Sequence, residues 1–304
     1  MVALIRLKSV TIGVPDVKGV AAYYSDFGLT QTTADSATSV SFATLEGGEQ
    51  LTLQATPLRR LLGIALEADN EEHLVRLSTD PTVLRFTREP EPTLVLRDPG
   101  AGVEVTITVG AEGLHGRILG RTPVERTVNT RAAEVLRTQR PRPLRLGHVV
   151  MGSPDHEASM SFFTRIGFKV SDYIKDVGAF LRCSIDHHNL LVQRAPVAFL
   201  HHTSWEVNDA DDVGRAASAM LEEDPNRHGW GFGRHLIGSN YFWYLRDPAG
   251  NMTEYFADMD EIVDDALWSP EVFSGKNALA VWGPPAPASF LRPDDLAELM
   301  QGSH

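Results

Sequence analysis

Histidine is concentrated in the second half of this 304-residue chain. Eight of the eleven histidines lie between residues 148 and 235, whereas residues 1–147 contain only His73 and His115. Imidazole binds divalent metals and exchanges protons near neutral pH, so metal or acid–base chemistry is expected in the second half. Glu254 follows within Met252–Phe256, a run that predicts a buried strand. A buried carboxylate costs several kcal/mol unless it is paired or binds a metal, so Glu254 is expected to have such a partner.

An internal repeat indicates which residues to compare. Arg6–Asp16 aligns with Arg145–Asp155 at an offset of 139 residues (145 − 6). Arg97-Asp-Pro-Gly later corresponds to Arg246-Asp-Pro-Ala at an offset of 149 (246 − 97), which an insertion in the second copy explains. Two homologous modules are the simplest account of this pattern.

The second module has three candidate metal ligands that the first module lacks. His148 aligns with Ser9, His202 with Gly63, and Glu254 with an apolar or hydroxyl residue near Val105 and Thr106. A single histidine on a strand is more often a core or surface residue than a ligand, but three residues at matched repeat positions favour a site. Two imidazoles and one carboxylate form the facial triad that binds Fe(II) or Mn(II) and leaves positions open for reactants. No cysteine joins the set, which disfavours a closed structural zinc site.

Each module reads as strands around two helices. Ser153-Pro154-Asp155 predicts a helix start, with Ser153 as the cap and Pro154 in the first turn. Apolar residues then recur at helical spacing up to Ile166, and Gly167 is expected to end the helix. A second helix is expected over Asp211–Glu223. The order predicts an α+β fold of two tandem modules, each made of paired βαβββ units.

The chain therefore divides into four parts. We expect a metal-free module over residues 1–115, a linker over 116–143, a metal-binding module over 144–260, and a tail over 261–304 that serves as a lid or an interface. The linker has seven arginines and no lysine, and its middle, Val124–Arg137, is expected to be helical. A basic run of this kind is more often a solvated surface than a ligand site.

Composition excludes several classes of partner. The formal net charge of −12 disfavours nucleic acid and anionic membranes. One cysteine, Cys183, cannot form an internal disulfide, and neither a signal peptide nor a membrane-spanning run is visible. We expect a cytoplasmic protein that assembles as a homo-oligomer.

Several motifs resemble those of the type I extradiol catechol dioxygenases of the vicinal oxygen chelate superfamily. They are Leu146-Gly-His148, Phe180-Leu-Arg-Cys183, Asp186-His-His188, Leu200-His-His-Thr-Ser-Trp-Glu206, and Gly233-Arg-His235 with Tyr244 and Glu254. His235, Tyr244 and Glu254 follow one another at intervals of nine and ten residues, which is similar to the signature of that family.

The resemblance implies an activity and a role for each residue. His148, His202 and Glu254 would hold Fe(II), with Mn(II) in a minority of relatives. His188 would be the acid–base residue, and His235 and Tyr244 would hydrogen-bond the substrate. The substrates would be a catechol-type small molecule and O2, and ring cleavage next to the diol would give a semialdehyde or keto acid in aromatic compound degradation.

The neighbouring residues give weaker expectations. Leu236-Ile237-Gly238 follows His235 where biphenyl-diol relatives carry polar residues, and no arginine apart from Arg234 lies next to the motif, so an uncharged, hydrophobic ring substituent is favoured. Phe180 and Trp230 are candidate pocket walls. His187 and His201 precede functional candidates, and strand alternation predicts that they point to the opposite face.

Two alternatives remain open at this point. A glyoxalase or 2-oxo-acid dioxygenase of the same superfamily would need the metal triad, but not His188, His235 and Tyr244 together. A metal-free binding protein of the same fold would be expected to lack the triad, as the first module does. A serine hydrolase is disfavoured because no Gly-x-Ser-x-Gly motif occurs.

Overall fold

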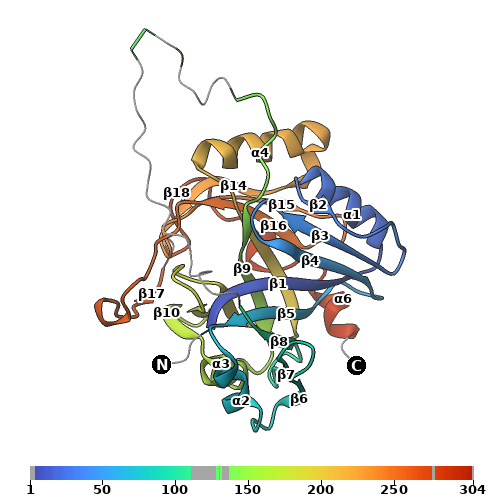
Figure 1. Ribbon diagram of the computed structural model, residues 1–304. Helices are drawn as coiled ribbons and strands as arrows, with labels where there is room; N and C mark the ends of the chain where they lie inside the picture. Colours follow the sequence, from blue (N-terminus) through green and yellow to red (C-terminus); the bar gives the residue numbers. More distant parts are fainter. Residues whose placement is uncertain (1–3, 111–127, 130, 132–136, 276–277, 303–304) are drawn as a thin grey trace.

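Two β-sheets of matching strand order form the framework of the protein in the computed structural model (Figure 1). The structure describes residues 4–110, 128–129, 131, 137–275 and 278–302. The elements of the first half are β1 (Leu4–Val14), α1 (Val17–Asp26), β2 (Thr30–Gln31), β3 (Ser39–Thr44), β4 (Gly48–Ala55), β5 (Arg60–Ala68), α2 (Glu71–Leu77), β6 (Val83–Thr87), β7 (Thr93–Arg97) and β8 (Glu104–Val109).

The second half repeats this order and adds a tail. Its elements are β9 (Arg145–Ser153), α3 (His156–Ile166), β10 (Lys169–Ile174), β11 (Gly178–Arg182), β12 (Leu190–Arg194), β13 (Phe199–Glu206), α4 (Ala210–Glu223), β14 (His228–His235), β15 (Tyr241–Arg246) and β16 (Met252–Ala257). The tail contributes β17 (Val272–Phe273), β18 (Ala280–Trp282), α5 (Ala288–Leu291) and α6 (Leu296–Gln301). Short 3-10 turns lie at Pro225–Arg227 and Asp265–Leu267.

The predicted paired βαβββ units are confirmed. The first sheet has the order β2-β3-β4-β1-β5-β8-β7-β6, and the second has β10-β11-β12-β9-β13-β16-β15-β14 between its two added edge strands. In both sheets the two units meet at a central antiparallel pair, β1 with β5 and β9 with β13. The predicted domain limits within this framework stay predictions.

The pairing of residues between strands shows where along the chain the insertion changes the offset between the two modules. Thr11 pairs with Gly63, and Val150 pairs with His202, so both central strands keep the offset of 139 (150 − 11 and 202 − 63). On the next strand, Gly63 pairs with Glu104 and His202 pairs with Met252, an offset of 148 (252 − 104). The residue of the first module that corresponds to Glu254 is therefore Thr106, a hydroxyl residue (254 − 148).

The helix start at α3 differs from the prediction in its cap. Asp155 is the N-cap, and its carboxylate accepts a hydrogen bond from the amide of Ala158. Ser153 still belongs to β9, and its hydroxyl contacts the Ser159 hydroxyl instead. A carboxylate is at least as good a cap as a hydroxyl, and it stood two residues closer to the helix. Gly167 ends the helix as predicted, at a φ of +122° that favours glycine.

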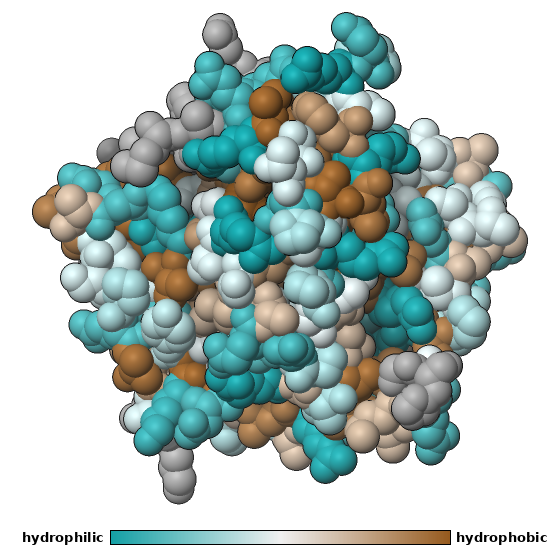
Figure 2. Space-filling view, turned by 90° about the horizontal axis from the view of Figure 1, so that it is seen from below, coloured by the Kyte–Doolittle hydropathy of each residue, from teal (hydrophilic) through white to brown (hydrophobic). Residues whose placement is uncertain are grey.

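Aromatic packing joins the two modules beside the strand that carries Glu254. The rings of Phe27 and Tyr255 are stacked with centroids 3.9 Å apart, and the Tyr255 hydroxyl donates to the carbonyl of Phe27 at 2.7 Å. Both residues are fully buried. The first module therefore packs against β16 and supports it, although it has no counterparts of His148, His202 and Glu254. On the molecular face in Figure 2, apolar side chains are interspersed with hydrophilic ones.

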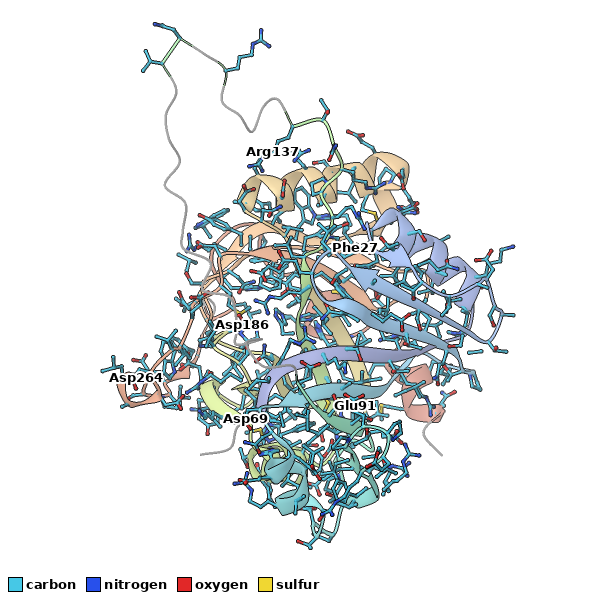
Figure 3. All side chains as sticks on the ribbon, in the orientation of Figure 1. Phe27, Asp69, Glu91, Arg137, Asp186 and Asp264 are labelled. Carbon is cyan, nitrogen blue, oxygen red and sulfur yellow. The ribbon has the colours of Figure 1, made fainter. Side chains whose placement is uncertain are left out.

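The linker and the tail both pack on the second module. Most of the predicted helix Val124–Arg137 lies outside the described residues, but Arg137 lies beside α4 (Figure 3) and binds Asp209 at 3.0 Å. In the tail, β17 pairs with β10 at one edge of the second sheet, and β18 pairs with β14 at the other. The two added strands have two and three residues, so the strands at the ends of this sheet are short, which limits pairing with other chains. Within the described residues, no helix has the length and apolar character required to cross a membrane.

Candidate active site

The three predicted metal ligands lie side by side on neighbouring strands. His148 is on β9, His202 on β13 and Glu254 on β16, and these strands are adjacent in the sheet. Ser204 pairs with His148 on one side and with Glu254 on the other, so these two residues are level across β13. His202 is two residues before Ser204, and the sheet register thus brings together residues that are far apart in sequence.

The ligand atoms have the spacing that a metal ion requires. Nε2 of His148 lies 3.0 Å from Oε2 of Glu254, Nε2 of His202 lies 3.6 Å from the same oxygen, and the two Nε2 atoms are 3.4 Å apart. Bonds of about 2.0–2.2 Å to a common ion, at right angles, would separate neighbouring ligand atoms by about 3 Å. All three side chains are buried.

Buried polar atoms without a hydrogen-bond partner indicate that a cation fits here. Oε2 of Glu254 and Nδ1 of His148 are buried and make no well-directed hydrogen bond among the described residues. Burial raises the pKa of Glu254, but the neighbouring histidines, His148 first, outweigh it and leave the pKa below its ordinary value. A buried, ionised carboxylate facing imidazole nitrogens is the donor set that a divalent metal binds.

A hydrogen-bonded histidine fixes the orientation of His202. Nε2 of His201 donates to the carbonyl of Phe290 at 2.7 Å, and Nδ1 of His201 lies 2.7 Å from Nδ1 of His202. Burial lowers the pKa of His201 to about 4, so this residue is neutral at neutral pH and its Nδ1 accepts. His202 must then donate from Nδ1, which leaves the lone pair of Nε2 directed at the other ligands.

The sequence analysis missed Asn240, which supports the carboxylate ligand. Its side-chain amide donates to Oε1 of Glu254 at 3.2 Å, and Asn240 is fully buried. Asn240 lies immediately before β15, and no spacing or repeat comparison distinguished it from an ordinary turn residue.

His235 and Tyr244 contact each other beside the carboxylate. The Tyr244 hydroxyl lies 2.8 Å from Nε2 of His235, whose Nδ1 donates to the carbonyl of Leu279 at 2.6 Å. Tyr244 is also the cross-strand partner of Glu254. Burial, and then the charge of Glu254, raise the pKa of Tyr244 well above its ordinary value, so the phenol keeps its proton and donates to His235.

His188 lies beside His148, one of the three candidate ligands. It belongs to the segment between β11 and β12, and its ring centroid is 4.3 Å from that of His148. Burial and then the neighbouring histidines lower the pKa of His188 well below its ordinary value. A neutral imidazole at this place can accept a proton from a molecule bound at the metal position.

The predicted directions of His187 and His201 were wrong. Nδ1 of His187 lies 3.1 Å from Nδ1 of His188, and His201 contacts His202 in the same way. His187 lies outside the strands, and the β9–β13 ladder is irregular between Leu200 and His202. Strict alternation of side chains does not hold at such positions.

Aromatic side chains flank the site on two sides. Phe180 lies 4.9 Å from the ring of His188, and Trp230 lies 5.6 Å from that of Tyr244. Phe290 from the tail packs against Trp230 and Tyr244 at 4.6 and 4.7 Å. The sequence analysis missed Phe290, because nothing in the tail indicates which part of it returns to the sheet.

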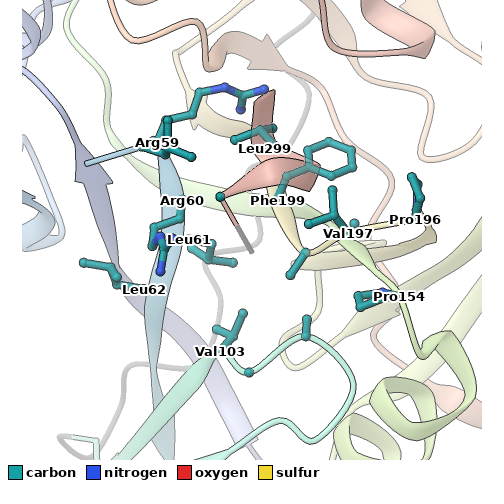
Figure 4. Close-up of a pocket in the computed structure, with 16 residues that line it drawn as sticks. Arg59, Arg60, Leu61, Leu62, Val103, Pro154, Pro196, Val197, Phe199 and Leu299 are labelled. Carbon is teal, nitrogen blue, oxygen red and sulfur yellow. The ribbon is translucent and has the colours of Figure 1, made fainter. Parts of the chain in front are cut away.

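A separate cavity of about 550 Å³ lies between the two modules and the tail (Figure 4). Its walls come from residues 58–62, 101–103 and 196–199, from Gly152 and Pro154, and from Leu299 and Gly302 at the end of the chain's last helix, α6. It contains none of the predicted site residues, and Arg59 at its edge is already bound to Asp295 at 2.6 Å. The converging titratable groups lie elsewhere, so this cavity is not the site of the chemistry.

Residues 145–255 match the family described as the Glyoxalase/Bleomycin resistance protein/Dioxygenase superfamily. Residues 145–255 thus carry a domain of this superfamily. The matched residues include the three candidate metal ligands, and also His188, His235 and Tyr244.

Curated relatives of this superfamily domain include dioxygenases. The chain is 38% identical over 157 residues to metapyrocatechase 2 of Cupriavidus necator, covering 51% of this chain and 49% of the relative. It is 32% identical over 125 residues to biphenyl-2,3-diol 1,2-dioxygenase of Paraburkholderia xenovorans (strain LB400), covering 36% and 40%. The matched segment thus spans half or less of the length of these relatives.

A solved structure resembles both modules together. The Mn(II)-bound glyoxalase from Novosphingobium aromaticivorans shares 26% identity and a TM-score of 0.72, covering 94% of each chain. This likeness confirms the predicted two-module arrangement of the vicinal oxygen chelate fold.

Proposed function

We propose that this protein is an extradiol ring-cleaving dioxygenase that inserts both atoms of O2 into a substituted catechol. The observation that carries the proposal is the meeting of the triad with His188, whose ring lies 4.3 Å from that of His148. Metapyrocatechase 2 and biphenyl-2,3-diol 1,2-dioxygenase are among the curated relatives, and their names support the proposal.

His148, His202 and Glu254 would hold the metal. A divalent metal there would lower the pKa of a bound catechol hydroxyl and would bring the catechol and O2 together in open positions. The triad thereby fixes the substrate close to the groups that move protons.

Side chains around the triad then transfer protons and orient the substrate. His188, neutral because burial lowers its pKa, takes a proton from the second catechol hydroxyl and later returns it. Tyr244 and His235, joined at 2.8 Å, orient the oxygen atoms on the other side. Burial of the triad excludes bulk water until the ring bond next to the diol is cleaved to a semialdehyde or keto acid.

An apolar wall beside His188 supports a hydrophobic ring substituent. Phe180 packs in a buried cluster with four aliphatic residues from four strands or loops, namely Val150, Ile174, Leu191 and Ile237. Within this cluster there is no charged partner for a carboxylated substituent. Phe180 is proposed as one pocket wall and Trp230 as the other.

Fe(II) is our choice of metal, because the facial triad with open positions is typical of non-haem iron oxygenases. Mn(II) is the alternative, and it is the ion named for the Novosphingobium structure. We propose a cytoplasmic location, supported by the single cysteine, Cys183, which is buried and free. Assembly as a homo-oligomer also stays a prediction.

A glyoxalase is the second candidate, because the structure that covers both modules has that name. A glyoxalase isomerises a thiohemiacetal without consuming O2, so it has no need of His188, His235 and Tyr244 together. Their presence around one triad favours the dioxygenase.

Anaerobic loading with Fe(II), followed by 3-methylcatechol and air, tests the proposal. We expect a yellow ring-opened product and the uptake of one O2 per catechol, whereas methylglyoxal with glutathione is expected to give no turnover. Absence of a yellow product and of O2 uptake with several catechols, in protein that retains iron, would contradict the dioxygenase. Thioester formation under the same conditions would identify the glyoxalase.

A further inference from the structure

We propose that Asp172 and His187 are positioning residues that hold His188 in the tautomer with a proton on Nδ1. In this tautomer Nε2 has the free lone pair that acid–base work requires. The proposal deepens the proposed function, on which its kinetic part rests, and it assigns roles to two residues that the sequence analysis did not connect with the chemistry.

A continuous buried chain of contacts connects the three residues. Nδ1 of His188 lies 3.1 Å from Nδ1 of His187, and Nε2 of His187 lies 2.9 Å from Oδ2 of Asp172. His187 is fully buried, and Asp172 and His188 are each 4% exposed. Water therefore does not replace any contact in this chain.

The backbone determines the direction of every proton in the chain. The amide of Glu271 donates to Oδ1 of Asp172 at 2.7 Å, so this oxygen is an acceptor. The carboxylate offers its other oxygen to Nε2 of His187, which must donate. With its proton on Nε2, His187 offers the lone pair of Nδ1 to Nδ1 of His188 at 3.1 Å, and this contact assigns the proton between them to Nδ1 of His188.

The same arrangement exists on the other side of the metal position. The carbonyl of Phe290, His201 and His202 form a chain of the same order, with both contacts at 2.7 Å. There the chain directs Nε2 of a ligand at the metal. At His188 the corresponding chain directs Nε2 at the bound substrate. In both pairs, the first histidine sets the tautomer of the second through a contact between their Nδ1 atoms.

Surrounding residues allow this chain only one geometry. The ring of Trp268 packs edge-on against His187 at 5.3 Å, and its Nε1 donates to the carbonyl of Ser171 at 2.8 Å. A Cβ on Gly238 would lie 3.1 Å from Cε1 of His188, so a larger residue there would displace the ring by a few tenths of an ångström.

The repeat offers an internal comparison. Register between β2 and β3, and between β10 and β11, keeps the offset of 139 at these positions (170 − 31 and 181 − 42). His187 and His188 then correspond to Gly48 and Glu49 of the first module, and Asp172, which follows a register shift after Val170, corresponds to Thr32 or Thr33. The metal-free module lacks the whole chain, and the module with the triad has all of it.

Asp172→Asn is the decisive substitution because the Glu271 amide fixes how the new side chain lies. The Asn oxygen must accept from that amide, which turns the NH2 group towards His187. His187 then accepts at Nε2 and donates from Nδ1, so His188 is forced to carry its proton on Nε2. The size of the side chain is unchanged, while the direction of every proton is reversed.

The tautomer is read directly by two-bond 1H–15N correlation spectra of the full chain with 15N-labelled histidine, after removal of metal by chelation. The His188 signals are assigned with His188→Phe. We expect the Nδ1–H form in the native protein and the Nε2–H form in Asp172→Asn. An Nε2–H or doubly protonated His188 in the native protein, or an unchanged tautomer in the variant, would overturn the proposal.

Kinetics of the iron-loaded protein give the second readout. For Asp172→Asn we expect kcat to fall by about 10- to 100-fold, with KM for 3-methylcatechol and iron content unchanged. His187→Asn keeps an acceptor near Nδ1 of His188 and should retain most of kcat, whereas His187→Leu removes it and should lose as much as Asp172→Asn. Equal activities of these two His187 variants would contradict the positioning role.

Asp98→Asn is the matched control. Asp98 is a fully buried carboxylate of the first module that accepts from the amides of Gly100 and Ala101, and its loss should leave kcat unchanged. If the native protein cleaves no catechol, the proposed function fails, while the spectra still decide the tautomer.

Discussion

Nε2 of His148 lies 3.0 Å from Oε2 of Glu254, although the two residues are on strands separated in the sheet by β13. Oε2 has no well-directed hydrogen bond among the described residues, so the contact stabilises the fold poorly without a cation. The two atoms have the spacing of two ligands that bind the same metal ion. The first prediction tests this interpretation.

Glu254→Ala should abolish metal retention. The variant keeps two imidazoles but loses the carboxylate that, among the described residues, completes the cluster with them, and three protein ligands are needed to hold the metal with open positions. Iron content after gel filtration, measured by atomic emission, is the readout. Thr106→Ala at the corresponding position of the first module is the control and should keep full iron. An unchanged iron content in Glu254→Ala would remove the triad.

His188→Phe should separate binding from turnover. The ring keeps its packing against Phe180, whose centroid lies 4.9 Å away, but it can no longer accept a proton. We expect normal iron content and normal catechol binding by titration, with kcat reduced by about 10²- to 10⁴-fold. Turnover at the native rate would show that another group moves the proton.

Gly238→Ala should displace His188 without disturbing the metal. The new Cβ would lie 3.1 Å from Cε1 and 3.2 Å from Nδ1 of His188, at a φ of +79°. We expect kcat to fall by about tenfold or more while iron is retained, because a small misplacement of a catalytic group is costly.

Gly102→Ala separates this steric effect from backbone strain. Gly102 has a φ of +75°, and a Cβ there would meet no described atom within 4 Å. Both substitutions should lower the free energy of unfolding by about 1 kcal/mol through strain, but only Gly238→Ala should lower kcat. Equal kcat values for the two variants would contradict the steric argument.

Asp247 should make the protein less stable as the pH rises through about 6. Burial raises the pKa of this carboxyl from 3.8 to about 6, although the hydrogen bonds from Asn251 act to lower it. The folded protein therefore binds the proton more tightly than the unfolded chain, and this contribution to stability is complete below pH 4 and lost above about pH 6. At about 1.4 kcal/mol per pH unit, the loss is on the order of 3 kcal/mol.

Urea unfolding of Asp247→Asn between pH 4 and pH 7.5 measures that contribution. The variant has no proton to lose, so its stability relative to the native protein should increase across this interval by about the same amount. A constant difference between the two proteins at all pH values would show that Asp247 does not titrate in this range.

The sequence by itself determined the repeat, the paired βαβββ units and the candidate ligand set. Local chemistry is enough for these features: Gly167 ends α3 because its φ of +122° favours glycine, and apolar alternation marks the strands. His148, His202 and Glu254 could be selected because the other copy of the module has Ser9, Gly63 and a residue near Val105 and Thr106 in their places, and strand register then identified Thr106.

Tertiary structure alone decided how the site is supported. Periodicity gives a side chain's direction only within a regular strand, so the irregular ladder at His201 and the segment around His187 could not be predicted. Asp172, Asn240 and Phe290 act through residues distant in sequence, at contacts that exist only once sheet and tail have packed. Residue types thus suggested which metal could bind, while packing set the tautomers and distances on which the chemistry depends.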